Sequence, residues 1–497
     1  MMAPLDHATP ATAARPRRGP ALLCALALLS AAACNDHAIS AGPPLDRFYF
    51  PTGLAIRHEP PGCTAGTAGC RTQLLVVSSN FDLGYDVAAG GSLISADVDQ
   101  ALAQAALPGA PSPLPVPVLG AIRIGSFGGE LAIADAETCP TWSGTAQALV
   151  ASRSQMQLYR VDVDAQGGLT CGDDCVVPLP AQFADAYGVT VACGTFPASA
   201  GAAPTPQALA FVSYLRAVAA EGWLSRIDLL AKDPAGRRTS PMVDVDMGVA
   251  PTGTAAFDAG TATAPAARLY VTGRFSQSSY YTPSPAGYTP LRWLELAAPA
   301  VAAVSVNVFS VIRGADLRGI ALSSDRTRAY VALRFYDPAV ATVYGMISIY
   351  DLAGALAVVD LAALSGPVPT LRILQIVPLD RGASEVRVIA RPGRRDLVAV
   401  TSSDDSSVSL FDDDVGEIAR TFTICDPTVE PSAPACDAGS AVMGANPFGL
   451  AVEPLASGSA RLYVGSFDRG WINLLQIDPT HPEAEPSLWI RIGPERT

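Results

Sequence analysis

The pentapeptide "ARLYV" occurs twice in this chain, at Ala267–Val271 and again at Ala460–Val464. Each copy follows a glycine that lies in a short apolar run, as in "PTGTAAF" from Pro251 and "NPFGLAV" from Asn446. The same order of glycine, apolar strand, turn and second apolar strand recurs in "LRGIALSSDRTRAYVAL", from Leu317. Recurrence of one pattern along a chain indicates an internal structural repeat.

The spacing of the glycines predicts the number of repeats. The clearest of them are Gly53, Gly253, Gly319 and Gly449. Their separations of 200, 66 and 130 residues are close to three, one and two times a period of about 66 residues. This period predicts three further units, which we place from Gly128, Pro206 and Glu385. Seven units result.

Each unit also contains a third apolar strand that ends in an acidic residue, as in "MISIYDL" and "INLLQID". Candidate fourth strands are Leu119–Gly125, Phe309–Ala315, Leu371–Val377 and Leu488–Gly493. Four short strands in each of seven units predict an all-β fold, a seven-bladed β-propeller with four-stranded antiparallel blades. We expect the last strand to lie near the N-terminal blade and close the ring. The alternative is two β-domains divided near residue 240, which the even spacing across that point disfavours.

The first 33 residues have the features of an export signal. Three arginines precede an apolar run of about 13 residues, which is too short to span a membrane. The run ends in "LLSAAAC", which resembles a bacterial lipobox and implies lipid attachment at Cys34. We therefore expect a lipoprotein-type signal peptide over 1–33, a flexible tether over 34–45 and the propeller over 46–497. The alternative is ordinary cleavage and a secreted protein.

Charge and cysteine content agree with export. The net charge of −13 disfavours nucleic-acid binding, and eight cysteines remain beyond Cys34, an even number that favours disulfides in an exported chain. We expect two local pairs in loops, Cys63 with Cys70 and Cys425 with Cys436. The other four, Cys139, Cys171, Cys175 and Cys193, allow three pairings, between which the sequence does not choose. The stretches 108–117 and 194–206, rich in Pro, Ala and Gly, are predicted loops.

The segment "LYVTG" at Leu269–Gly273, with "PTG" before it, resembles the YVTN-type repeats of bacterial surface and lactonase-like seven-bladed propellers. The resemblance covers most of residues 45–495 and implies the propeller fold. It carries no catalytic residue to this chain, because Gly273 stands where that motif ends in Asn.

Propellers present ligand-binding residues on loops that enter the innermost strand and on loops that join the second and third strands. In this sequence those loops carry Arg, Asp and aromatic residues, which suit stacking and bidentate contacts to sugars, peptides or acidic groups. The expected binding residues are Asn80, Arg153, Arg274, Arg334, Asp404, Asn446, Asp468 and Arg469. The alternative is that these polar residues solvate exposed loops and tie the blades together.

Two functions remain open. The first is a monomeric binding or scaffolding module at the cell envelope, whose partner is an envelope protein, a peptide or a glycan. The second is a Ca²⁺-dependent lactonase-like hydrolase, to which Asn80, Asp404, Asn446 and Asp468 would contribute ligands. We favour the first, because the sequence lacks a G-x-S-x-G elbow and a histidine in the expected binding loops. No cofactor other than a possible Ca²⁺ ion is expected.

Overall fold

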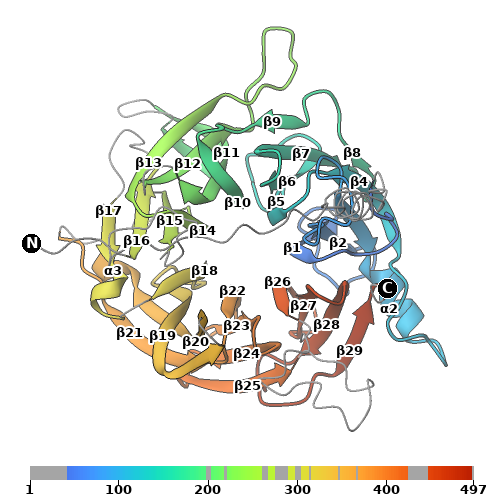
Figure 1. Cartoon of the computed structure of the whole chain (residues 1–497). Helices are drawn as coiled ribbons and strands as arrows, with labels where there is room; N and C mark the ends of the chain where they lie inside the picture. Colours follow the sequence, from blue (N-terminus) through green and yellow to red (C-terminus); the bar gives the residue numbers. More distant parts are fainter. Residues whose placement is uncertain are drawn as a thin grey trace, which may run out of the picture. The chain divides into compact units, whose positions relative to one another are not determined.

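The structure is a computed structural model. It describes residues 42–197, 203–217, 221–259, 267–274, 289–296, 304–312, 315–344, 347–364, 368–423 and 446–494. Seven separate antiparallel sheets follow one another along the chain and stand around a common axis (Figure 1). The predicted seven-bladed β-propeller is confirmed.

Each blade is built from consecutive strands, the first of them nearest the axis. Blade 1 contains β1 Pro51–Glu59, β2 Arg71–Ser78, β3 Gly91–Asp97 and β4 Val118–Ile124. Blade 2 contains β5 Gly128–Ala134, β6 Ala146–Ser152, β7 Gln157–Val163, β8 Leu169–Thr170 and β9 Val176–Pro178. Blade 3 contains β10 Phe183–Pro197, β11 Pro204–Ala217, β12 Glu221–Asp228 and β13 Met242–Val249. Blade 4 contains β14 Thr252–Asp258, β15 Arg268–Gly273, β16 Pro290–Glu295 and β17 Val304–Asn307.

The remaining three blades repeat this order. Blade 5 contains β18 Asp316–Leu322, β19 Arg328–Tyr344, β20 Ile347–Asp360 and β21 Ile373–Leu379. Blade 6 contains β22 Ala383–Ile389, β23 Leu397–Ser402, β24 Ser407–Asp412 and β25 Glu417–Thr423. Blade 7 contains β26 Pro447–Pro454, β27 Ala460–Ser466, β28 Trp471–Ile477 and β29 Leu488–Ile492. The short helices are α2 Val98–Ala105, η2 Val308–Ser310 and α3 Leu361–Leu364.

All seven innermost strands share one irregularity, a shift in pairing register at the same place in the blade. The shifts begin at Pro51, Gly128, Ala186, Thr252, Leu317, Ala383 and Pro447. A β-bulge re-aims the side chains beside it and increases the local twist. The repeat that the glycines mark in the sequence is therefore a repeated bulge at the axis.

At three glycines of the bulges, Gly53, Gly129 and Gly319, neighbouring inner strands approach closely. A Cβ atom on Gly129 would lie 2.2 Å from the carbonyl oxygen of Tyr187 in blade 3. A Cβ on Gly319 would lie 2.4 Å from the carbonyl oxygen of Ser384, and one on Gly53 would lie 2.8 Å from that of Gly129. Each obstacle is backbone of the next blade, so the spacing of the blades leaves no room for a side chain.

The hydrophobic core is divided among the contacts between blades. The described residues form seven clusters, and each cluster combines residues from two neighbouring blades. For example, Val77 of blade 1 packs with Val150 of blade 2, and Tyr463 of blade 7 packs with Leu74 of blade 1. Since both faces of a blade are covered by its neighbours, its central strands consist largely of apolar residues on both faces.

Three expectations about element boundaries were wrong. Pro206 does not begin blade 3, because the innermost strand β10 starts at Phe183 and Gly188 stands at its bulge. The predicted loop 194–206 is partly strand, since β10 and β11 pair as far as Pro197 and Pro204. The fourth strand of blade 4 is β17, not Phe309–Ala315, because a 3₁₀ turn begins at Val308 and buries Val308 and Ile312 between blades 4 and 5.

The disfavoured alternative, two β-domains divided near residue 240, is excluded. That residue lies in the connection between β12 and β13, which pair in one sheet. Residues 41–497 form a single compact unit. The expected loop 108–117 does connect strands, but inside blade 1, between α2 and β4, rather than between two blades.

The repeated pentapeptide forms part of the second strand in blades 4 and 7. Alternate residues of a strand share a face, so the Arg and Tyr in "RLY" act together. In blade 7, Arg461 pairs with Glu453 at 3.1 Å, and the Tyr463 hydroxyl donates to the same carboxylate at 2.6 Å. The equivalent "RAY" of blade 5 binds Asp413 of blade 6 in the same way, through Arg328 at 2.6 Å and Tyr330 at 3.0 Å.

The ring closes without exchange of strands, because each blade is a continuous segment of chain. The last strand β29 lies beside blade 1, as expected, and Leu114 exchanges two main-chain hydrogen bonds with it, to Arg491 and Gly493. Phe48, just before β1, shares a buried cluster with Ile492. These contacts cover the junction between the first and last blades.

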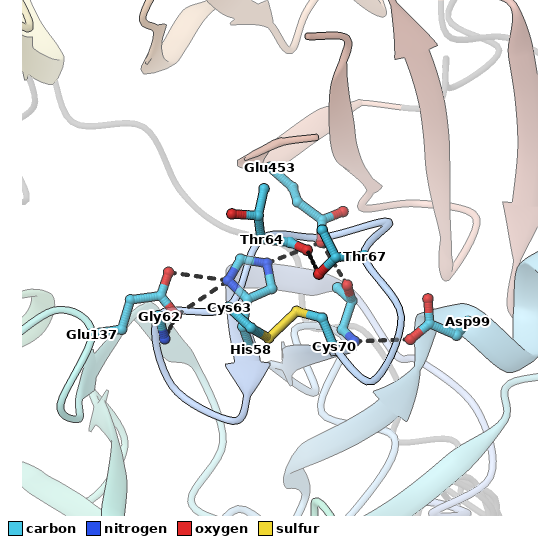
Figure 2. The surroundings of a disulfide bond; sticks show 10 residues. His58, Gly62, Cys63, Thr64, Thr67, Cys70, Asp99, Glu137 and Glu453 are labelled. Atoms are coloured by element: carbon cyan, nitrogen blue, oxygen red, sulfur yellow. Dashed lines mark hydrogen bonds and ion pairs between the residues drawn. A yellow bond between two sulfur atoms is a disulfide. The ribbon is translucent and has the colours of Figure 1, made fainter. Parts of the chain in front are cut away.

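A buried histidine links three blades at this closure (Figure 2). The His58 side chain, on β1, lies between Glu453 of blade 7, at 3.1 Å, and Glu137 of blade 2, at 3.0 Å. Hydrogen bonds to Glu137 and Glu453 outweigh the opposing effect of burial and raise the pKa of His58 to about 9. His58 is therefore charged at neutral pH and compensates the carboxylate of Glu453, which is fully buried.

Three disulfides are formed among the described residues. Cys63 and Cys70 pair as predicted, beside His58 (Figure 2). The four central cysteines pair as Cys139–Cys193, which ties blade 2 to blade 3, and as Cys171–Cys175, which closes the turn between β8 and β9. Cys425 and Cys436 lie outside the described residues.

We predict that the His58 link makes the fold sensitive to alkali. Its contribution is complete below about pH 6.5, the ordinary histidine pKa, and is lost as the pH rises through about 9. The urea midpoint of the wild type should fall between pH 7 and pH 9.5 by more than that of His58→Gln. Replacement of the exposed His481 by Gln is the control and should follow the wild type. Parallel pH profiles for His58→Gln and the wild type would contradict this role.

We predict that the disulfide between blades stabilises the fold more than the local one. Cross-linking entropy gives about 4 kcal/mol for the loop closed by Cys139 and Cys193 and about 2 kcal/mol for that closed by Cys171 and Cys175, from separations of 54 and 4 residues. Paired Cys→Ala variants should therefore lose thermal stability in that order. Calorimetry of both variants provides the check, and equal losses or the reverse order would contradict the prediction.

Candidate functional site

The candidate site is a cavity on the axis, at the end of the channel where the loops between second and third strands gather. It consists of two adjoining hollows of about 380 and 290 Å³. Four residues line both of them: Arg153, Tyr187, Arg318 and Phe448. Volumes of this size are typical of small-molecule and side-chain binding sites.

Three inner-strand residues of the cavity stand immediately before a marker glycine. They are Tyr187, Arg318 and Phe448, beside Gly188, Gly319 and Gly449. The bulge at each of these glycines re-aims the neighbouring side chains. The bulges that allow close packing at the axis therefore also place polar and aromatic side chains in the cavity.

One wall of the larger hollow is cationic. Arg274, just after β15, and Arg318, on β18, both bind the buried carboxylate of Asp316, at 2.9 and 2.7 Å. Burial acts to raise the pKa of Asp316, but the charges of Arg274 and Arg318 lower it below its usual value. Asp316 is thus a carboxylate shared by two arginines, and it neutralises one of their two charges.

The remaining positive charge of this group affects the pKa of Arg318. Burial and repulsion from Arg274 and Arg334 lower the pKa of Arg318 from its usual range, although Asp316 opposes the shift. A lowered arginine pKa means that the surroundings penalise the positive charge. An anion placed beside Arg318 would therefore be stabilised.

Two further arginines, Arg153 and Arg334, extend the cationic wall into the smaller hollow. Arg153, in the turn between β6 and β7, pairs with Asp185 at 3.2 Å and lies over the ring of Phe127, 5.8 Å from its centroid. Arg334, on β19, donates to the carbonyl oxygens of Gly382 and Ala383 and is 3.9 Å from Asp404. Arg334 therefore holds the entry to β22 in place as well as lining the smaller hollow.

Part of the lining of the smaller hollow is aromatic. Phe81, Phe127, Phe448 and Phe467 line it, from blades 1, 2 and 7. Phe81 lies 5.8 Å from Phe127 and 5.2 Å from Phe467, centroid to centroid, with the rings nearly perpendicular. Edge-to-face contacts of this kind hold the rings in a defined arrangement. The cavity is thus amphipathic, lined by guanidinium groups and phenyl rings.

A carboxyl pair lies at the same level of the channel. Glu130 on β5 and Glu385 on β22 hydrogen-bond to each other, and Glu385 also pairs with Arg387 at 3.0 Å. Burial and the charge of Glu385 raise the pKa of Glu130 well above its usual value. Glu130 therefore keeps its proton to a higher pH than an exposed carboxyl group does. Burial and the same two carboxyls also raise the pKa of Tyr187.

Five of the eight residues predicted for binding come together here. Arg153 and Arg274 line the larger hollow, and Arg153, Arg334, Asp404 and Asn446 line the smaller one. The other three, Asn80, Asp468 and Arg469, do not line either hollow. Asn80 is fully buried and binds Tyr85 and Ser126, while Arg469 lies 6.0 Å from the ring of Trp471.

The four residues considered as Ca²⁺ ligands are not gathered into one group. Asn80 is buried beneath its loop, and Asp404 lies against Ser403 and Arg334. Over the described ranges, no group of three or more His, Cys, Asp or Glu residues is placed to hold a metal ion.

Within the same ranges, no helix has the length and apolar character needed to cross a membrane.

Tyr187 and Glu385 were not singled out from the sequence as binding residues. Tyr187 was missed because the first strand of blade 3 was placed too late in the chain. Glu385 was missed because it takes the place of the marker glycine in blade 6, so the blade lacks that mark. The signal that would have found both is their position within the bulge: Tyr187 directly precedes the marker glycine of blade 3, and Glu385 stands at the equivalent of that glycine in blade 6.

No protein-family model and no curated protein matches this chain. Among solved structures, hydrazine synthase of Kuenenia stuttgartiensis is similar with a TM-score of 0.48 and 10% identity, over 90% of this chain and 99% of that chain. Dihydro-heme d1 dehydrogenase NirN in complex with DHE gives 0.40 and 15%, over 86% and 65%. BBS1N in complex with ARL6DN gives 0.41 and 10%, over 89% and 98%. None of these likenesses carries an argument about the ligand or activity of this chain.

Proposed function

We propose that this protein is a binding module that receives an acidic group of a protein or peptide partner in its axial cavity. The observation that carries the proposal is the cationic wall, where Arg153, Arg274, Arg318 and Arg334 converge from blades 2, 4 and 5. Guanidinium groups bind carboxylates through paired, charge-assisted hydrogen bonds. The lowered pKa of Arg318 supports an anion as the preferred occupant.

The cavity is also preorganised for binding. Asp316 fixes Arg274 and Arg318, and the Phe127 ring and Asp185 fix Arg153. Side chains that are already held lose little conformational entropy when a ligand arrives. An acidic group entering the cavity would therefore meet donors that need little rearrangement.

The proposed place of action is the cell envelope. The sequence supports export through residues 1–33 and attachment to a membrane through a lipid on Cys34, with 34–45 as the tether and the propeller acting as a monomer. Residues 1–41, including Cys34, lie outside the described part of the chain. The resemblance to YVTN-type surface propellers supports the same location.

Binding of capped oligopeptides tests the proposed function. By isothermal calorimetry, hexaglutamate should bind the wild type and hexaglutamine should not, and the affinity should fall as salt is added. Arg274→Gln should weaken hexaglutamate binding on the order of tenfold, because one charge-assisted contact is lost. Arg274 is preferred to Arg334 for this test because its partner Asp316 remains paired with Arg318. The variant therefore leaves no buried carboxylate without a partner.

The control is Arg237→Gln, which removes an exposed arginine of blade 3 that lines neither hollow. It should bind hexaglutamate as the wild type does. Equal affinity of the wild type and Arg274→Gln would refute the proposal. Tighter binding of oligogalacturonate than of hexaglutamate, with the same dependence on Arg274, would replace the peptide partner with an acidic glycan.

A further inference from the structure

Three exposed apolar side chains lie on one loop, and the first of them, Phe81, lines the smaller hollow. Phe81, Leu83 and Val87 belong to the loop between β2 and β3 of blade 1, and their exposed fractions are 53%, 44% and 44%. We call these three residues the apolar shelf. Large apolar side chains exposed together on one short loop are candidates for burial by a partner.

The loop that carries the shelf is anchored at several points. The buried Asn80 side chain receives a hydrogen bond from the Tyr85 amide and donates to the Tyr85 carbonyl and to Ser126. The Tyr85 hydroxyl donates to that of Tyr49, at 2.8 Å. Asn80, predicted from the sequence as a binding residue, therefore holds the loop that presents the shelf.

The shelf is continuous with the cationic wall. Phe81 lines the smaller hollow together with Arg153, Arg318 and Arg334. Phe127 connects the two sides, because its ring lies 5.8 Å from that of Phe81 and 5.8 Å from the guanidinium carbon of Arg153. A ligand bound to Arg153 is therefore within reach of the Phe81 end of the shelf.

Resting on the proposed function, we infer that the partner is a polypeptide segment that places an acidic side chain in the cavity and a large apolar side chain on the shelf. The arginines complement the acid, and Phe81, Leu83 and Val87 complement the apolar group. Two of the three shelf residues, Leu83 and Val87, are aliphatic and offer no ring face for a sugar to stack on, which favours an apolar side chain. The Phe81 ring centroid and the guanidinium carbon of Arg153 each lie 5.8 Å from the Phe127 ring centroid, so they are at most about 12 Å apart. An extended chain advances about 3.3 Å per residue, so the two partner side chains are one to three residues apart.

Selection of a phage-displayed random dodecapeptide library on the full chain tests this inference. The enriched peptides should contain Asp or Glu within about three residues of Phe, Trp, Leu or Met. The best peptide is then synthesised and its affinity is measured. Phe81→Ser and Arg153→Gln should each weaken it on the order of tenfold. Leu83→Ser, which leaves the Phe81 ring contacts in place, should weaken it to a smaller extent.

Val243→Ser is the matched control, because Val243 on β13 is exposed to 61% and lines neither hollow. It should not change the affinity. Acidic peptides that need Arg153 but bind Phe81→Ser and Leu83→Ser as well as the wild type would overturn the inference and leave the proposed function standing. Enrichment without acidic residues, or the absence of any enriched peptide, would overturn both.

Discussion

The structure depends on how closely the seven innermost strands approach one another around the axis. At Gly53, Gly129 and Gly319 the backbone of the next blade occupies the space that a Cβ atom would need. The same position carries a bulge in every blade, and the bulge aims Tyr187, Arg318 and other flanking side chains at the axis. Packing at the axis and the chemistry of the cavity therefore have a common origin.

Buried ion pairs between blades complement this packing. A buried charge is tolerated where it is paired and hydrogen-bonded, and here the pairs commonly join different blades. His58 links blade 1 to blades 7 and 2, and Asp413 of blade 6 binds Arg328 and Tyr330 of blade 5. Misplacing one blade would leave such charges unpaired. We infer that the pairs help to fix the order of blades that the apolar contacts alone would specify less sharply.

Much of the fold was predictable because the bulge of the innermost strand recurs in each of the seven blades and leaves a repeated sequence pattern. The period of about 66 residues, the number of blades and the local Cys63–Cys70 pair all follow from the sequence. The beginning of blade 3 was missed because its strand β10 lies in a region of inserted loops. The bulge of blade 6 carries no marker glycine, because Glu385 stands at that position. The cavity was predicted in part: loop positions pointed to Arg153 and Arg274, but the approach of Glu130 to Glu385 joins blades 2 and 6 and depends on three-dimensional closure.

The most direct measurement is the stability of two Gly→Ala variants. Gly129→Ala places a methyl group 2.2 Å from the Tyr187 carbonyl oxygen, whereas Gly144→Ala, in a connecting loop, has its nearest neighbour at 3.8 Å. Chemical denaturation should show that Gly129→Ala loses at least about 2 kcal/mol, because the inner strands must move apart. Gly144→Ala should remain within about 0.5 kcal/mol of the wild type. Wild-type stability in both variants would contradict the close approach at the axis.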